Sequence, residues 1–120
     1  MHRLEIPKYR RPSSPGEIIR GLFLEDEEFD FTRGQVADRL GINHQTFTAL
    51  LNGRRAVDPL MAMRLERVVG LSAQTWLDLQ LAVDIYDAMR SPEAKRIAKL
   101  KPIMARKPTR RKRAKSSRAA

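Results

Sequence analysis

The chain has 120 residues, of which 42% are hydrophobic, with no cysteine and a formal net charge of +10. This length allows one domain with a modest core, and the lack of cysteine excludes disulfides and Cys-based zinc sites. No run approaches the roughly 18 apolar residues that span a bilayer, and the N-terminus lacks the apolar stretch of a signal peptide. We therefore expect a soluble, cytoplasmic protein.

The positive charge is concentrated at the C-terminal end. Residues 1–93 carry 12 Lys/Arg and 14 Asp/Glu, whereas residues 94–120 carry 12 Lys/Arg and no acid. We divide the chain into an N-terminal arm (1–12), a helical domain (13–90) and a basic flexible tail (91–120). The tail has few large apolar residues, so it is predicted to be mostly disordered when free, although residues 93–100 can form two helical turns. Such tails add salt-sensitive, non-specific affinity for nucleic acid, and a solubilising extension is the alternative.

The first predicted helix begins at the sequence Ser-Pro-Gly-Glu. Ser14 is placed to cap it, Pro15 takes the first helical position, and Glu17 completes a capping box. Helical spacing predicts an inward face made by Ile18, Leu22 and Phe23.

An acidic connector, residues 25–30, follows this helix and has the sequence EDEEFD. It lacks the Asp/Asn/Gly alternation of a calcium-binding EF-hand, and no acid or base is placed to form a catalytic pair. A solvated loop is the default interpretation, and docking to a basic protein partner is the alternative.

Residues 32–55 hold two short helical patterns that meet at a glycine, the arrangement of a helix-turn-helix. Thr32 and Gln35 fit a capping box, Gly41 can adopt the positive φ of the turn, and Asn43 is placed to cap the second helix. Ile42 is expected at the corner between the helices. The inward-facing side chains are predicted to be Val36, Ala37, Leu40, Phe47, Leu50 and Leu51.

The outward face of the second helix is composed of short polar or small side chains that suit contact with base edges in a major groove. They are His44, Gln45, Thr46, Thr48 and Ala49. Arg54 and Arg55 follow directly, where DNA phosphates are expected. An ordinary helical hairpin in an all-α core is the alternative, but the face lacks the Glu/Lys pairs of a merely solvated helix, which favours DNA binding.

Two further helices are predicted. Asp58 and Pro59 start the fourth, which ends at Gly70 and has the predicted inward residues Leu60, Met61, Leu65 and Val68. Ser72 starts the fifth, which is apolar around most of its circumference. Because one of its faces remains to be covered, we expect a homodimer around a two-fold axis, with Trp76, Leu79, Val83 and Tyr86 as dimerisation residues. A helix buried on all sides by its own chain is the alternative.

Five pieces of the chain, taken in order, resemble the HigA-type antitoxins, a branch of the Cro/phage-repressor helix-turn-helix superfamily. They are residues 15–18 (PGEI), 40–42 (LGI), 50–55 (LLNGRR), 59–65 (PLMAMRL) and 76–80 (WLDLQ), and the resemblance covers about residues 12 to 90. It implies an all-α, five-helix lambda-repressor-like DNA-binding domain that dimerises through its C-terminal part. It also implies repression of its own operon and neutralisation of a RelE-like toxin that cuts messenger RNA. The acidic connector and the basic tail depart from the family's common core.

The resemblance also implies roles for individual residues. Gln45 is expected to bond a base edge, most naturally adenine, and Gln35 to brace Gln45 or bond a phosphate. Thr32, Asn52, Arg54 and Arg55 are expected to hold the DNA backbone of a palindromic operator. A basic toxin is expected to meet the first helix and the carboxylates Glu25, Asp26, Glu27 and Glu28.

Catalysis is not expected from this sequence. Neither His2 nor His44 has a carboxylate or nucleophile at local spacing, and the chain has no phosphate-binding glycine loop or metal-ligand cluster. We expect no cofactor, no metal and no membrane partner. A solitary transcriptional regulator or a nucleoid-associated DNA-binding protein remains the alternative to an antitoxin.

Overall fold

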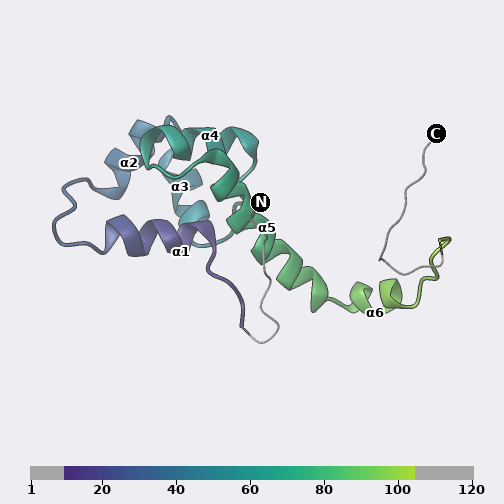
Figure 1. Cartoon of the computed structure of the whole chain (residues 1–120). Coiled ribbons are helices and arrows are strands. Elements are labelled where there is room, and N and C mark those ends of the chain that lie inside the picture. The colour runs from purple at the N-terminus through teal and green to yellow at the C-terminus, as the bar shows by residue number, and fades with distance from the viewer. Residues whose placement is uncertain (1–9, 105–120) are drawn as a thin grey trace, which may run out of the picture. The chain divides into compact units, whose positions relative to one another are not determined.

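The computed structural model describes residues 10–104, and they fall into two units, one up to Arg90 and one from Ser91 onward. The first unit contains α1 (Pro15–Ile19), a π-helical turn η1 (Arg20–Leu24), α2 (Arg33–Leu40), α3 (His44–Leu51), α4 (Pro59–Val68) and α5 (Ala73–Met89) (Figure 1). The second contains α6 (Pro92–Ala98). The all-α prediction is confirmed. The described residues form six α-helices and one π-helical turn, rather than five helices alone.

The predicted helix starts are confirmed by their caps. Ser14 Oγ accepts the Glu17 N–H at 3.2 Å while Glu17 Oε1 accepts the Ser14 N–H at 2.8 Å. Asp58 caps α4 through the Met61 N–H at 2.8 Å. Such caps satisfy backbone donors that have no partner within the helix, so each start is fixed by local sequence.

Of the three residues predicted to face inward from the first helix, Ile18 and Phe23 pack against the core, whereas Leu22 is 52% exposed. The most buried side chain of this helix is Ile19, at 1% exposed. The reason is the π-helical turn η1, whose i→i+5 hydrogen bonds insert an extra residue into the turn and rotate the following side chains. Sequence spacing at the α-helical period cannot show this change of register.

The core of the first unit lies between α1 to α4 and the N-terminal half of α5. On α4 the buried residues are Met61, Ala62 and Leu65, whereas Leu60 and Val68, which were predicted to face inward, are exposed. The inward side is set by packing of α4 on α5 and α2, which leaves Leu60 on the outer side. The other core side chains are Ile19, Val36, Ala37, Leu40, Phe47, Leu50, Leu51, Val57 and Trp76.

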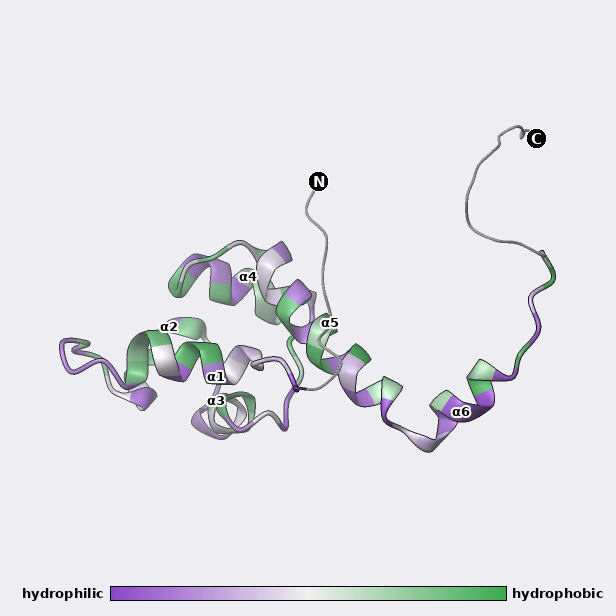
Figure 2. Ribbon diagram, turned by 60° about the horizontal axis from the view of Figure 1, so that its bottom comes forward, coloured by the Kyte–Doolittle hydropathy of each residue, from purple (hydrophilic) through white to green (hydrophobic). Residues whose placement is uncertain are grey.

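The structure corrects the predicted dimerisation residues on α5. Trp76 is fully buried, and its indole Nε1–H donates to Gly70 O at 2.7 Å. Val83 and Tyr86 are also buried within their own chain, and Leu79 is half-buried against the core. The exposed apolar side chains of this helix are instead Leu81 and Met89, at 46% and 52%. Figure 2 shows hydrophobic residues on α5 as far as its C-terminal turn.

Gln80, Asp84 and Asp87 form a polar stripe along α5, and two of these residues bond other parts of the same unit. Gln80 Oε1 accepts the Val57 N–H at 2.9 Å, which fixes the segment before α4. Asp87 accepts two hydrogen bonds of 3.0 Å from the Arg11 guanidinium, which ties the N-terminal arm to the helix. These bonds lower the pKa of the Asp87 carboxyl from its ordinary value. The polar stripe therefore positions the segment before α4 and the N-terminal arm.

The second unit holds α6 within the segment predicted to be a flexible tail. The helix begins at Pro92, close to the two turns predicted over residues 93–100, and it has no buried residue. The cationic run at residues 110–113 lies outside the described residues. None of the helices in residues 10–104 has the length and hydrophobicity that spanning a bilayer requires.

Candidate nucleic-acid interface

The two helices of the predicted helix-turn-helix are α2 and α3, and the predicted turn chemistry is confirmed. Thr32 and Gln35 form the capping box, with bonds of 3.1 and 2.8 Å. Gly41 has a φ of +74°, which an L side chain rarely adopts. Asn43 Oδ1 accepts the Thr46 N–H at 2.7 Å and starts α3. The turn between the helices is therefore specified by residues within it.

The C-terminal ends of both helices are held by arginines from elsewhere in the unit. Arg64 on α4 donates to Leu40 O at 2.7 Å and to Gly41 O at 3.2 Å, at the end of α2. Arg20 in η1 donates to Leu51 O at 3.3 Å and to Asn52 Oδ1, at the end of α3. Cationic side chains at these positions satisfy the last carbonyls and the negative end of the helix dipole. Neither contact could be predicted from the sequence, because the partners lie far apart along the chain.

The predicted base-reading residues lie together on α3. His44, Gln45 and Thr48 are exposed, and Thr46 and Ala49 are half-buried. A shallow surface hollow is lined by His44, Gln45, Thr48, Ala49 and Arg54. We call this surface the α3 hollow. It brings four of the five predicted base-reading residues beside one of the predicted phosphate-binding arginines.

The predicted phosphate-binding residues are all exposed, and they are Thr32, Gln35, Asn52, Arg54 and Arg55. The backbone N–H groups of Arg54 and Arg55 donate to Ala49 O at 2.8 and 3.2 Å, which places both arginines at the end of α3. Gln35 Oε1 accepts a hydrogen bond from the Thr32 N–H. The side-chain NH2 group of Gln35 is therefore the group that can donate to a phosphate. Asn52 Oδ1 accepts from Arg20, so its amide is the corresponding donor.

The structure adds Asp38 to this surface. Its Oδ1 lies 3.1 Å from His44 Nε2, and both side chains are largely exposed. His44 was predicted to face outward, and no role was predicted for Asp38. The two residues are six positions apart, which is not a contact spacing of a single helix.

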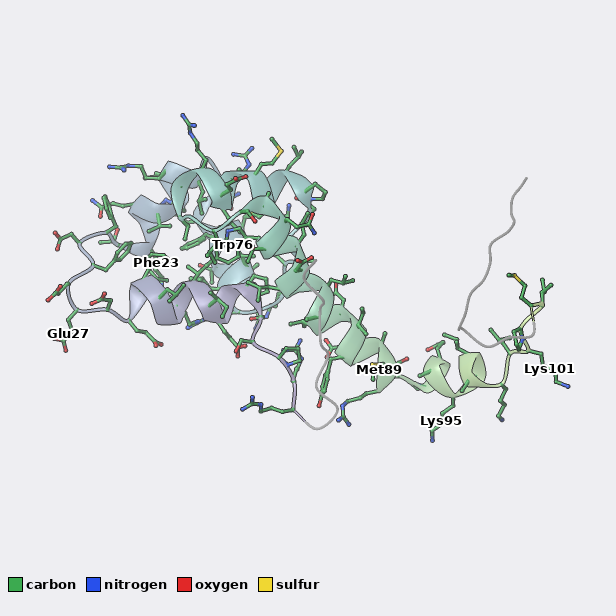
Figure 3. The ribbon with its side chains drawn as sticks, in the orientation of Figure 1. Phe23, Glu27, Trp76, Met89, Lys95 and Lys101 are labelled. Carbon is green, nitrogen blue, oxygen red and sulfur yellow. The ribbon has the colours of Figure 1, made fainter. Side chains whose placement is uncertain are left out.

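The acidic connector is anchored by aromatic rings. Phe29 packs between Phe23 and Phe31, with ring centroids 5.7 and 5.5 Å apart, and the Arg39 guanidinium lies 4.8 Å from the centroid of Phe31. Glu27 points outward from the connector, whereas Phe23 points inward (Figure 3). An apolar pocket of about 100 Å³ lies beneath, with walls formed mainly by these rings, Ile19, Leu24, Val36, Val68 and Val69. The connector therefore presents carboxylates on an ordered aromatic base.

No protein-family model matches the chain. Several curated relatives do match it, among them an antitoxin and a transcriptional regulator. Antitoxin HigA-1 of Vibrio cholerae is 35% identical over 78 residues, which cover 65% of this chain and 71% of the relative. The uncharacterized HTH-type transcriptional regulator YbaQ of Escherichia coli is 33% identical over 87 residues, covering 70% of this chain and 75% of the relative. The chain belongs to the HigA-type antitoxin family of helix-turn-helix proteins.

Solved structures of HigA-type antitoxins have the same fold. The antitoxin HigA of Pseudomonas aeruginosa, solved with the higBA promoter, is 31% identical and superposes with a TM-score of 0.68. The alignment covers 78% of this chain and all of that one. The relatives are regulators and antitoxins rather than enzymes. Within residues 10–104, no group of three or more His, Asp or Glu side chains could hold a metal ion.

Proposed function

We propose that this protein is a dimeric, sequence-specific DNA-binding autorepressor and the antitoxin of a type II toxin–antitoxin module. The observation that carries the proposal is the α3 hollow, where base-reading side chains lie beside Arg54 on a capped helix. Support comes from the HigA relative that was solved with promoter DNA. An autorepressor acts where the chromosome lies, so the cytoplasm is its expected location.

Within this proposal α3 is the recognition helix. Gln45 makes two hydrogen bonds to one base edge, with adenine the best match, and His44, Thr46 and Thr48 add base or sugar contacts. Ala49 is small enough to contact a thymine methyl group. Phosphates are held at both ends of the motif, by Thr32 and Gln35 at one end and by Asn52, Arg54 and Arg55 at the other.

We place the dimer contact on the exposed apolar side of α5. Leu81 and Met89 are about half exposed, and Ile85 between them is half-buried. Apolar side chains in a row on one helix lose water contact when a second copy covers them, which favours association around a two-fold axis. Such a dimer presents two recognition helices to a palindromic operator.

We assign toxin docking to the acidic connector. Glu25, Asp26, Glu27 and Glu28 are all exposed, and phosphates repel carboxylates, so this surface suits a basic protein rather than DNA. The aromatic base beneath reduces the entropy lost when a partner binds, because the connector is already ordered. A RelE-like ribonuclease, which binds messenger RNA, is a partner of this chemistry.

A solitary transcriptional regulator is the second candidate. The observation that favours it is the likeness to YbaQ, which is named as an HTH-type transcriptional regulator and not as an antitoxin. In a solitary regulator the DNA-binding surface is kept and the toxin is absent.

Expression of the native locus with a tag on this protein tests the proposal. We expect the untagged product of the adjacent small gene to co-purify in fixed stoichiometry and to stop growth when expressed alone. Promoter binding without such a partner would establish the solitary regulator. Equal affinity for promoter and scrambled DNA would contradict both candidates.

A further inference from the structure

The imidazole of His44 rests against α2 rather than projecting away from it. An ideal Cβ built on Gly34 would lie 3.0 Å from His44 Cε1, 3.5 Å from Nδ1 and 3.6 Å from Nε2. The ring therefore lies over the position where any other residue at 34 would carry its side chain. Glycine is unfavourable inside a helix relative to alanine. Space for the ring is a physical reason for glycine at this position.

Asp38 holds the same ring from one turn further along α2. Its Oδ1 lies 3.1 Å from His44 Nε2. The His44 side chain remains 63% exposed and lines the α3 hollow with Gln45 and Thr48, so it stays available to DNA. Gly34 and Asp38 together form a seat that fixes the ring on the surface predicted to face the major groove.

The seat fixes which nitrogen of His44 carries the proton. An ionised carboxylate only accepts hydrogen bonds, so Nε2 must be the N–H in the bond to Asp38. In the neutral ring Nδ1 is then the acceptor. In the major groove, the base groups that donate are the amino groups of adenine N6 and cytosine N4, whereas guanine presents acceptors.

The position of the Asp38 carboxylate on a surface predicted to face DNA also requires a physical explanation. Asp38 is 73% exposed, and phosphates near α2 and α3 would repel it. Pairing with the His44 N–H gives the carboxylate a partner and a role in recognition.

We propose that Gly34 and Asp38 are specificity-determining positions of this protein. They seat His44 so that Nδ1 accepts a hydrogen bond from an adenine or cytosine amino group at one base pair of the operator. Asp38 is a positioning residue that acts through His44. The inference rests on the proposed DNA-binding function and adds the class of base that His44 reads.

The experiment is selection from an operator pool randomised at each position, with sequencing of bound DNA, for the full-length chain and its variants. The variants are Asp38→Leu, His44→Ala, their combination, and Gly34→Ala. Gly21→Ala is the matched control, because a Cβ at Gly21 meets nothing within 4 Å. Circular dichroism of each variant separates misfolding from altered recognition.

We expect one base pair at which the wild type prefers adenine or cytosine and at which His44→Ala removes the preference. Asp38→Leu keeps a side chain of similar size but removes the acceptor, so the ring proton is no longer confined to Nε2 and can move to Nδ1. The preference at that base pair then falls by about five- to tenfold, shifting toward guanine. Gly34→Ala reduces the same preference, whereas Gly21→Ala leaves the profile unchanged.

Four outcomes would overturn the inference. The first two are a wild-type preference for guanine at the His44-dependent base pair and an unchanged profile for Asp38→Leu. The other two are an Asp38→Leu effect that persists when His44 is alanine and a His44→Ala profile that matches wild type. Failure of the proposed function gives a different result, because the wild type itself would then enrich no sequence.

Discussion

Arg64 Nη1 lies 2.7 Å from the carbonyl oxygen of Leu40 and joins α4 to the end of α2. The same nitrogen donates to Gly41 O, so the turn of the helix-turn-helix is held by a side chain from outside the motif. Arg20 does the same for the end of α3 through Leu51 O. The geometry of the α3 hollow therefore depends on two cations that do not need to touch DNA.

Replacing Arg64 by methionine should destabilise the domain. The variant keeps the aliphatic part of the side chain but loses bonds to two carbonyls, so we expect a loss of about 1 to 2 kcal/mol in the free energy of unfolding. Urea denaturation followed by circular dichroism measures it. Arg67→Met, on the exposed side of the same helix, is the control and should change stability far less. Equal losses for the two variants would contradict the capping role of Arg64.

Glutamate at both Leu81 and Met89 should convert the dimer to a monomer. Two carboxylates in the apolar contact would each have to lose water without a partner. Sedimentation equilibrium measures the mass, and circular dichroism should show an unchanged helix content because both side chains are about half exposed. Leu60→Glu, on an exposed position of α4, serves as control and should remain dimeric. A dimeric double variant would rule out this face of α5.

Charge reversal in the acidic connector should separate the two proposed activities. Glu27→Lys with Glu28→Lys is expected to weaken binding of the co-purified toxin at least tenfold, since opposite charges become like charges. Promoter affinity should not fall. Glu66→Lys, which makes half of this charge change on α4, controls for net charge. Unchanged toxin affinity in the connector variant would remove this surface from the interface.

The bond between Arg11 and Asp87 predicts a pH-dependent contribution to stability. Hydrogen bonds from Arg11 lower the pKa of the Asp87 carboxyl below its ordinary value of 3.8. A lowered folded-state pKa contributes stability that is present above the ordinary value and is lost as the pH falls through the lowered one. Because the pair is about half exposed, the contribution is roughly 0.2 to 1 kcal/mol.

Urea unfolding of wild type and Asp87→Asn at several pH values measures the contribution of this ion pair to the free energy of unfolding. We expect wild type to be more stable from neutral pH down to about pH 5, with the difference shrinking below pH 4. Glu66→Gln controls for the general effect of losing a carboxylate. A difference that stayed constant down to pH 3 would mean that the ion pair is not its source.

Helix starts and the turn could be predicted from sequence because their determinants are local. Ser14, Thr32, Asn43 and Asp58 each bond a backbone N–H three positions ahead, and Gly41 meets its φ requirement by itself. The family could also be recognised from local sequence, because its motifs are short stretches of residues that occur in a fixed order.

The predictions that failed concern residues whose positions depend on contacts with distant parts of the chain. Trp76 was predicted as an interface residue because α5 is apolar all round, but its indole bonds Gly70 O and the ring fills the core. Leu22 turned outward because η1 changes the helical register. The bond from His44 to Asp38 depends on how α2 and α3 pack, which residue spacing alone does not specify.

Sequence reading by α3 is tested by measuring the affinities of Gln45→Ala and Arg54→Ala for the protein's own promoter and for scrambled DNA. Fluorescence anisotropy at fixed salt gives both affinities. For Gln45→Ala we predict a loss of about 1–3 kcal/mol on the promoter and little change on scrambled DNA. For Arg54→Ala we predict equal losses on both. Equal losses for Gln45→Ala on promoter and scrambled DNA would contradict the claim that α3 reads the operator sequence.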